Sequence, residues 1–443
     1  MLTYLKNATI ASPLVSGFKG QKKNILIEDE YIKEVFDENV SLSESVEVID
    51  CEGLLVLPGI IDVHVHFRQP GMEYKADMQS ESKAALIGGV TTVFDMPNNN
   101  PPIVSEELLN KKLSLCKDNM LCNYGLYLGL TNDNTEQAIH MDKDKIVGLK
   151  LFLGSSTGNM LVDREESIIN LFKKSPFIIT AHCEDEQSIK DNILKYKQIN
   201  PLPYNIHCLI RNEQSCYKSS VFAIELAKKY NTNFHLAHIS TAKEISLLSD
   251  DKVENKHITC EVSPNHLLFS QEDYKQYGNF IKCNPAIKTK EDRQLLRQAL
   301  KEGYIDMIAT DHAPHLKEEK QQDYFKAPSG IPSIQYSLLT MLQIAKEENW
   351  DLYLIPQKMS ENPAKRFNIK KRGFIKKSYF ADLVFVKLGQ KTTVTEDNIF
   401  SKCKWSPFEN HTFDNSIVMT MLNGKIVARE GNCLTNFSYS QKV

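Results

Sequence analysis

The stretch DVHVHFRQPG, residues 62–71, alternates apolar and polar residues in the way that is typical of a β-strand. Because successive side chains point to opposite faces, His64 and His66 are expected on one face, about 7 Å apart along the strand. Two neutral imidazoles at this spacing can reach one metal ion of the zinc type. Arg68 follows on the same face and offers a planar fork to a carboxylate. The Gln-Pro-Gly sequence that comes next ends the strand.

The chain that follows predicts a closed barrel. From Leu54 onward, apolar runs typical of strands alternate with amphipathic stretches typical of helices, such as 80–87, 106–115, 163–173, 212–229 and 290–300. The expected strands are 62–67, 91–95, 124–128, 148–153, 177–182, 234–238, 257–262 and 307–310. Strands and helices that alternate over about 250 residues are typical of a (β/α)8 barrel of the TIM type. The alternative is an open doubly wound sheet, which is disfavoured because no Gly-x-Gly-x-x-Gly turn follows the first strand.

The two ends of the chain predict a second, smaller unit. Residues 1–53 hold short apolar runs separated by Gly, Asp and Asn, which predict part of a small antiparallel sheet. Short strands return after about residue 361, and Asn423-Gly424 between two apolar runs is a strong hairpin signal. We therefore expect a barrel at 54–365 beside a small β-sandwich built from 1–53 and 366–443. The charged segment 317–326 is expected to be a solvated or mobile loop.

Composition limits the possible functions. With 42% hydrophobic and 25% charged residues, the 443-residue chain has an ordinary globular composition. A net charge of -3 favours neither a nucleic acid nor an anionic membrane as a partner. No apolar run approaches the ~18 residues of a membrane span, and the first residues lack the pattern of a signal peptide. The ten cysteines form no Cys-x-x-Cys pair, so we expect reduced thiols in a cytoplasmic protein.

Further polar residues stand where the other expected strands end, which is where a barrel places its active site. They are Asn98, His182, His238, Asp311 and His315, with Lys150 inside the fourth strand. Each has a structural alternative: a His-x-His pair can face solvent, Asp311 can cap a turn, and His182 or His238 can be a hydrogen-bonded core residue. So many ligand-type residues at one end of the barrel favour a metal site.

The other histidines are interpreted from their position. His238 is preferred to His235, because His235 should face the other side of a regular strand and lies farther from the strand end. His312 should point away from Asp311, and His207 could lie near the barrel mouth. We interpret the remaining ones as structural: His140, His257, His266 and His411.

Lys150 is unusual for a site that binds cations, because burial and like charge both disfavour an ammonium there. Its neutral amine can add carbon dioxide to give an anionic carbamate with two oxygens. Such a group could bridge two metal ions about 3.5–4 Å apart. The alternative is an ordinary lysine paired with a carboxylate.

Taken together, these motifs make the chain resemble the amidohydrolase superfamily and, within it, the dihydroorotases. The resemblance is carried by DVHVHFRQPG, FDMPNNNP, GLKLFLG, TAHCEDE, HLAHIST, CEVSPNHLLF, KCNPAIK and ATDHAPH, and outside the barrel by NPAKRFNI, FADLVFV and KCKWSPFENHTFDNSI. It covers essentially the whole chain. HVHFRQPG together with ATDHAPH is the most specific pair.

The resemblance implies a role for each candidate residue. His64, His66 and Asp311 would hold the more buried of two divalent metal ions, for which we expect zinc, and His182 with His238 would hold the second. Lys150 would bridge the two as a carbamate, since this chain has lysine where some branches of the family have an aspartate bridge. The substrate carboxylate would be bound by Arg68, Asn98 and His315; Asn284 would contact the substrate ring, and the backbone of 327–330 would line the other side of the pocket.

The implied activity is the reversible hydrolysis of L-dihydroorotate to N-carbamoyl-L-aspartate, a step of pyrimidine biosynthesis. A metal-bridging hydroxide would attack the ring amide, and Asp311 would act as general base and then acid. The alternatives are a dihydropyrimidinase, hydantoinase or allantoinase, whose substrates lack the ring carboxylate that Arg68 would bind. Another is a non-catalytic partner of aspartate transcarbamoylase, although this chain keeps the ligand residues. A homodimer and an association with that enzyme are further expectations.

Three departures from the family pattern stand out. Gln69 replaces a frequent glutamate and should point away from the metals. Asn265 stands where many relatives have histidine, and residues 377–380 replace a turn that usually contains glycine. The last change should affect the small β domain rather than the chemistry.

Overall fold

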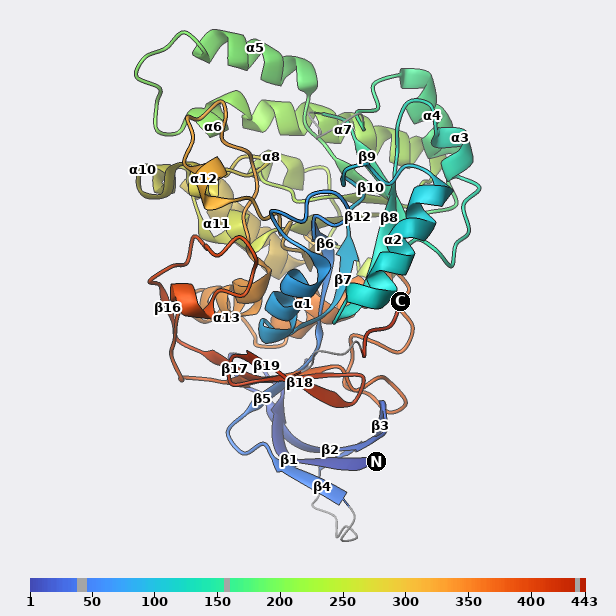
Figure 1. The fold of residues 1–443 in the computed structure, drawn as a ribbon, viewed down its shortest axis with the longest axis vertical. Helices are drawn as coiled ribbons and strands as arrows, with labels where there is room; N and C mark the ends of the chain where they lie inside the picture. The colour runs from blue at the N-terminus through green and yellow to red at the C-terminus, as the bar shows by residue number, and fades with distance from the viewer. Residues whose placement is uncertain (38–45, 155–159, 435–438) are drawn as a thin grey trace.

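The computed structural model describes residues 1–37, 46–154, 160–434 and 439–443, and eight parallel strands form its central barrel (Figure 1). Their spatial order is their order in the chain. This order confirms the (β/α)8 fold, because an open doubly wound sheet reverses its strand order. The strands are β6 (Ile60–Val65), β7 (Val90–Asp95), β8 (Asn123–Gly129), β9 (Gly148–Phe152), β10 (Ile179–His182), β11 (Phe234–Leu236), β12 (Ile258–Val262) and β13 (Met307–Ile308).

Helices surround the barrel, and local sequence signals begin the main ones. Asp77, Ser105, Asn212 and Thr289 each accept a hydrogen bond from the backbone N–H three residues on, which satisfies one of the unpaired donors of the first turn. The helices of more than five residues are α1 (Met78–Ile87), α2 (Glu106–Asn119), α4 (Glu165–Lys174), α5 (Glu186–Tyr196), α7 (Glu213–Tyr230), α11 (Lys290–Glu302) and α13 (Ser337–Glu347). The shorter α-helices are α3 (Thr135–Ala138), α6 (Ile206–Ile210), α8 (Ala242–Ile245), α9 (Pro264–Leu268), α10 (Tyr274–Tyr277), α12 (Lys317–Lys320), α14 (Leu354–Pro356) and α15 (Asn362–Arg366).

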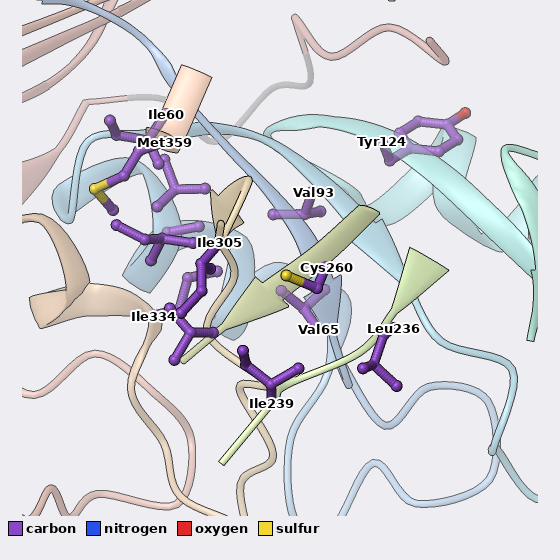
Figure 2. Close-up of a cluster of buried hydrophobic side chains, with 14 of the residues drawn as sticks. Ile60, Val65, Val93, Tyr124, Leu236, Ile239, Cys260, Ile305, Ile334 and Met359 are labelled. Atoms are coloured by element: carbon purple, nitrogen blue, oxygen red, sulfur yellow. The ribbon is translucent and has the colours of Figure 1, made fainter. Parts of the chain in front are cut away.

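The largest hydrophobic core lies between the strands and the helices. Figure 2 shows Val65, Val93, Leu236 and Cys260 of four strands in one buried cluster with Ile334 and other residues. These side chains are removed from water almost completely, and such burial is the main favourable contribution to folding. None of the helices in the part of the chain that the structure describes is long and apolar enough to cross a membrane.

A bulge in β6 decides which side chains enter the barrel. The register between β6 and β7 shifts within the strand. Before the shift, Ile61 and Val63 pack with aromatic residues of β7 and β8 in a separate apolar cluster. Beyond it, Val65 belongs to the outer core, while His64 and His66 line the cavity described below. A regular strand would place Val63 and Val65 on the same face, so the bulge is what turns the two histidines inward.

The barrel closes between its first and last strands through side chains as well as backbone. Val65 forms a parallel bridge with His312, and the His66 amide donates to the His312 carbonyl at 2.8 Å. Asp62 accepts from the Thr310 amide at 3.0 Å and from the Thr310 hydroxyl at 2.6 Å. Both residues are at most 2% exposed, so these hydrogen bonds have no competition from water.

The small β domain is built from both ends of the chain, as expected. In Figure 1 its N-terminal strands (blue) and C-terminal strands (red) lie together below the barrel. The expected hairpin at Asn423-Gly424 is present, with both residues at positive φ. Its nine-stranded sheet contains β1 (Leu2–Ile10), β2 (Gln21–Glu28), β3 (Tyr31–Phe36), β4 (Val46–Asp50), β5 (Leu55–Pro58), β14 (Leu383–Lys387), β17 (Ser416–Leu422), β18 (Lys425–Arg429) and β19 (Asn432–Cys433). A separate pair is formed by β15 (Thr392–Thr393) and β16 (Thr412–Phe413).

Two details of this sheet differ from expectation. The sheet is mixed rather than antiparallel, because β1 pairs in parallel with both β4 and β5. Strand β5, which follows the expected domain boundary at residue 53, also pairs with β14. The small domain therefore extends to Pro58, and the barrel begins with β6.

We predict that Thr310→Val lowers the free energy of unfolding by about 1–3 kcal/mol, because it leaves a buried Asp62 oxygen without its donor. Thr92→Val is the matched control: the Thr92 hydroxyl is also fully buried but has no hydrogen-bond partner among the described residues. Its loss should change stability by less than about 0.5 kcal/mol. Urea unfolding of the metal-free protein measures both; equal effects would show that the Asp62 hydrogen bond does not stabilise the barrel.

Candidate metal centre

A cavity of about 220 Å³ opens at the carboxyl ends of the barrel strands. All ten residues predicted for the site line it, although they come from seven separate segments of the chain. The predicted residues are His64, His66, Arg68, Asn98, Lys150, His182, His238, Asn284, Asp311 and His315, and the wall is completed by Phe152, Ala313, Pro328, Ser329 and Gly330. The structure thus brings together every candidate side chain and most of the backbone expected at 327–330.

His64, His66 and Asp311 form the first group of metal-binding atoms. One atom from each lies within 4.8 Å of the other two. Asp311 Oδ1 is 3.1 Å from His66 Nε2 and 3.5 Å from His64 Nε2. The other ring nitrogens donate elsewhere: His64 Nδ1 to Glu261 at 2.5 Å and His66 Nδ1 to Asn98 at 2.7 Å. Three lone pairs therefore converge with no hydrogen between them, which is the arrangement that a cation stabilises.

Electrostatics keep this group in the form that binds metal. Burial lowers the pKa of His66 to about 4, so its imidazole is neutral at physiological pH. Burial also raises the pKa of Asp311, but His64 and His66 outweigh that effect and bring it down to about 2. The Asp311 carboxylate is therefore ionised wherever the His66 imidazole is neutral, and both groups are good ligands in that state.

His182 and His238 form a second pair of facing nitrogens. His182 Nδ1 lies 3.1 Å from His238 Nε2, and His182 Nε2 donates to Glu184 at 2.9 Å. Burial lowers the pKa of both imidazoles, and for His238 the neighbouring histidines add to the effect. His238 reaches this position because its backbone has φ of +33° after β11 has ended.

Lys150, on β9, lines the same cavity and is near enough to both groups for its charge to act on His182, His238 and Asp311. Its side chain is fully buried, and its Nζ has no hydrogen-bond partner among the described residues. Burial lowers its pKa to about 8, against the attraction of Glu261 and Asp311. The alternative of an ordinary lysine in an ion pair does not fit, since no carboxylate of the described chain pairs with it within 4.0 Å. An unpaired, more easily deprotonated amine fits the expected carbamate.

Comparison with known proteins identifies the family. The model of the Amidohydrolase family matches residues 55–427. The chain belongs to the amidohydrolase family. Curated dihydroorotases are similar over nearly its whole length: that of Methanosphaera stadtmanae is 31% identical over 92% of this chain and 94% of its own, and that of Lactobacillus delbrueckii subsp. bulgaricus is 32% identical over 97% and 100%. Among solved structures, the L-hydantoinase (dihydropyrimidinase) of Arthrobacter aurescens matches with a TM-score of 0.92 at 24% identity, over 99% of this chain and 98% of that one, which supports the fold alone.

The protein is thus an amidohydrolase with a His-His-Asp metal-binding group. Two carboxylates behind this group were not singled out in the sequence. Glu261 accepts from His64 Nδ1 and from His235 Nε2 at 3.1 Å, and Glu184 accepts from His182 and from Arg211. Both are fully buried. Both stand in the motifs TAHCEDE and CEVSPNHLLF, and the strand alternation of β12, which turns Glu261 inward, was the signal available.

The expectation for His235 was wrong in one respect. We expected it to face away from the barrel interior, yet it shares Glu261 with His64, and its ring centroid lies 5.6 Å from that of Phe367. Because β11 ends at Leu236, the chain leaves regular alternation before His238, and both imidazoles point inward. His235 lies below the metal-binding atoms and does not line the cavity.

Four further residues that were discussed from the sequence can also be placed in the structure. His312 points away from Asp311 and bonds Glu81 at 2.8 Å. His207 does not line the cavity but links Tyr324 to the Cys283 carbonyl at its rim. Gln69 points away and accepts from the Met78 amide, and Asn265 donates to Ser333 at 3.3 Å.

The segment 317–326 was wrongly expected to be wholly solvated or mobile. It begins with α12, and Lys320 is only 1% exposed. Lys320 Nζ donates to the carbonyls of Lys282, Pro328 and Gly330 at 2.9–3.0 Å. A buried ammonium surrounded by carbonyl groups therefore holds the backbone that forms one wall of the cavity.

We predict that Glu261→Gln weakens metal binding by about 10- to 100-fold, because a neutral amide no longer holds the His64 ring by a charged hydrogen bond. Glu272→Gln, at a partly exposed glutamate that pairs with Lys275 and does not line the cavity, is the matched control. Metal content per chain after dialysis against graded chelator concentrations measures the effect. Equal retention by both variants would refute a role of Glu261 in orienting His64.

Proposed function

We propose that this amidohydrolase is a dihydroorotase, which interconverts L-dihydroorotate plus water and N-carbamoyl-L-aspartate. The observation that carries the proposal is Arg68, which lines the same cavity as the metal-binding group. Arg68 is only 6% exposed, and its Nε donates to the Pro314 carbonyl at 3.0 Å. It forms no ion pair with any described carboxylate. A buried guanidinium that forms no direct ion pair favours a substrate that carries a carboxylate.

Two divalent metal ions, for which zinc is our proposal, would be held at this site. His64, His66 and Asp311 would bind one, His182 and His238 the other, and the Lys150 carbamate would bridge them. When bound, such ions lower the pKa of water and polarise an amide carbonyl, which is what amide hydrolysis requires.

The side chains of the protein would orient the substrate and move its proton. Arg68 and His315 would bind the ring carboxylate on one side of the cavity, together with Asn98. Asn284 faces the cavity with an Oδ1 that has no hydrogen-bond partner among the described residues, so it can accept from a ring N–H. Asp311, ionised between its two histidines, would take a proton from the attacking water at Oδ and return it to the leaving ring nitrogen.

We predict that the zinc-loaded protein hydrolyses L-dihydroorotate and not dihydrouracil or allantoin. Arg68→Ala should lower kcat/KM by at least about 100-fold, because it removes a charged hydrogen bond to the substrate, and should leave bound metal unchanged. Arg164→Ala, at an exposed arginine that does not line the cavity, is the control and should retain full activity.

The other outcomes of this assay are informative. Turnover of dihydrouracil instead would keep the metal chemistry and refute the role of Arg68. Loss of metal in Arg68→Ala would show a structural role for the arginine. No turnover of any substrate by metal-loaded protein would favour a non-catalytic partner of aspartate transcarbamoylase.

We predict that Lys150→Ala loses most of its metal, because both ions lose a shared anionic ligand. Added acetate or propionate should restore part of the metal content and activity by occupying the vacated space. Lys143→Ala, at an exposed lysine, is the control. Metal analysis decides the question, and full metal content in Lys150→Ala would refute the carbamate bridge.

A further inference from the structure

The buried side chain of Lys75 lies behind the side of the cavity that is formed by Arg68 and His315. Lys75, in the loop that connects β6 to α1, is 8% exposed and does not line the cavity. Its Nζ lies 3.0 Å from His315 Nδ1 and 3.1 Å from Glu319 Oε1. Arg68 Nη2 lies 3.0 Å from the other ring nitrogen of His315, Nε2. The imidazole is therefore held between two cations.

The hydrogen bonds of this arrangement cannot all form at once, because one imidazole lone pair faces two donors. A guanidinium and an ammonium only donate, whereas a neutral imidazole has one N–H and one lone pair. Burial lowers the pKa of His315 to about 3, so the ring has a single proton. It can accept from Arg68 or from Lys75, but not from both. Glu319 Oε2, at 3.5 Å from Nδ1, is too distant to serve as a good acceptor for that nitrogen.

We propose that Lys75 is a positioning residue that commits His315 to donate its Nε2 hydrogen to the substrate carboxylate. When Lys75 donates to Nδ1, the ring proton must be on Nε2, which faces Arg68 and the cavity. A carboxylate bound between Arg68 and His315 accepts from both and removes the donor–donor contact. This inference rests on the proposed function, because it places a ring carboxylate on this side of the cavity.

The charges around His315 support the same arrangement. Arg68, Lys75 and Lys320 contribute positive charge around His315, and Glu319 contributes one negative charge that holds Lys75 in place. A net positive charge is therefore left for an incoming anion. Glu319 belongs to α12, whose Lys320 also holds the backbone wall of the cavity, so the same short helix supports the carboxylate side from two directions.

Steady-state kinetics and ligand binding test the proposal with metal-loaded full-length protein. For Lys75→Met we expect the KM for L-dihydroorotate to rise about tenfold while kcat changes less than about twofold. Affinity for orotate, measured by calorimetry, should fall by a similar factor, whereas affinity for the neutral orotamide should not. Lys75→Arg should retain most of the preference for orotate, and Lys317→Met, at an exposed lysine of α12, should behave as wild type.

The tautomer of His315 provides a readout that needs no change at position 75. Long-range ¹H–¹⁵N spectra of histidine-labelled protein, assigned with His315→Asn, should show the proton on Nε2 in the wild-type complex with orotate. A proton on Nδ1, or equal loss of orotate and orotamide binding in Lys75→Met, would overturn the role of Lys75 while leaving the proposed function intact. Failure of the wild-type protein to hydrolyse L-dihydroorotate would overturn both, and this is seen before any variant is made.

Discussion

Glu261 is a carboxylate inside the barrel, out of reach of water, and much of the site depends on how its charge is satisfied. It accepts from His64 on one side and from His235 on the other. An ionised group in such a place is strongly destabilising unless donors surround it. Those two donors in turn determine that the free lone pair of His64 points at Asp311. The metal-binding geometry is thus a consequence of satisfying a buried charge.

The cavity is divided electrostatically. On the metal side, neutral imidazoles and the carboxylates of Asp311, Glu184 and Glu261 favour cations. On the opposite side, Arg68 and Lys75 favour an anion, with His315 between them. A ligand that offers a polarisable amide to one side and a carboxylate to the other matches this division. Under the proposed function, the distinction between cyclic amides would rest on the side of the cavity that holds no metal ligand.

Backbone irregularities place several of these groups. Arg68, His238 and Asp311 all have positive φ, which is uncommon for residues with a side chain. Each stands just beyond the end of a strand, where the chain has left the sheet ladder and can turn a side chain back over the barrel mouth. The bulge in β6, which precedes Arg68 in the chain, likewise turns side chains toward the inside of the barrel. Regular strands alone would not have brought these side chains together.

The sequence by itself determined the barrel, the hairpin and most of the cavity side chains, because alternation of apolar and polar residues and turn signals are local. Asn284 was implied only by the family resemblance. Only the tertiary structure decided which buried residues hydrogen-bond to the cavity residues and hold them in position. Glu184, Glu261, Lys75 and Lys320 contact groups far away in the chain, and a charged residue in a strand or loop looks the same in sequence whether it is solvated or buried. His235 was misplaced for the same reason, since the end of β11 depends on pairing with β10 and β12. Burial, and with it the requirement for a partner, exists only once distant segments meet.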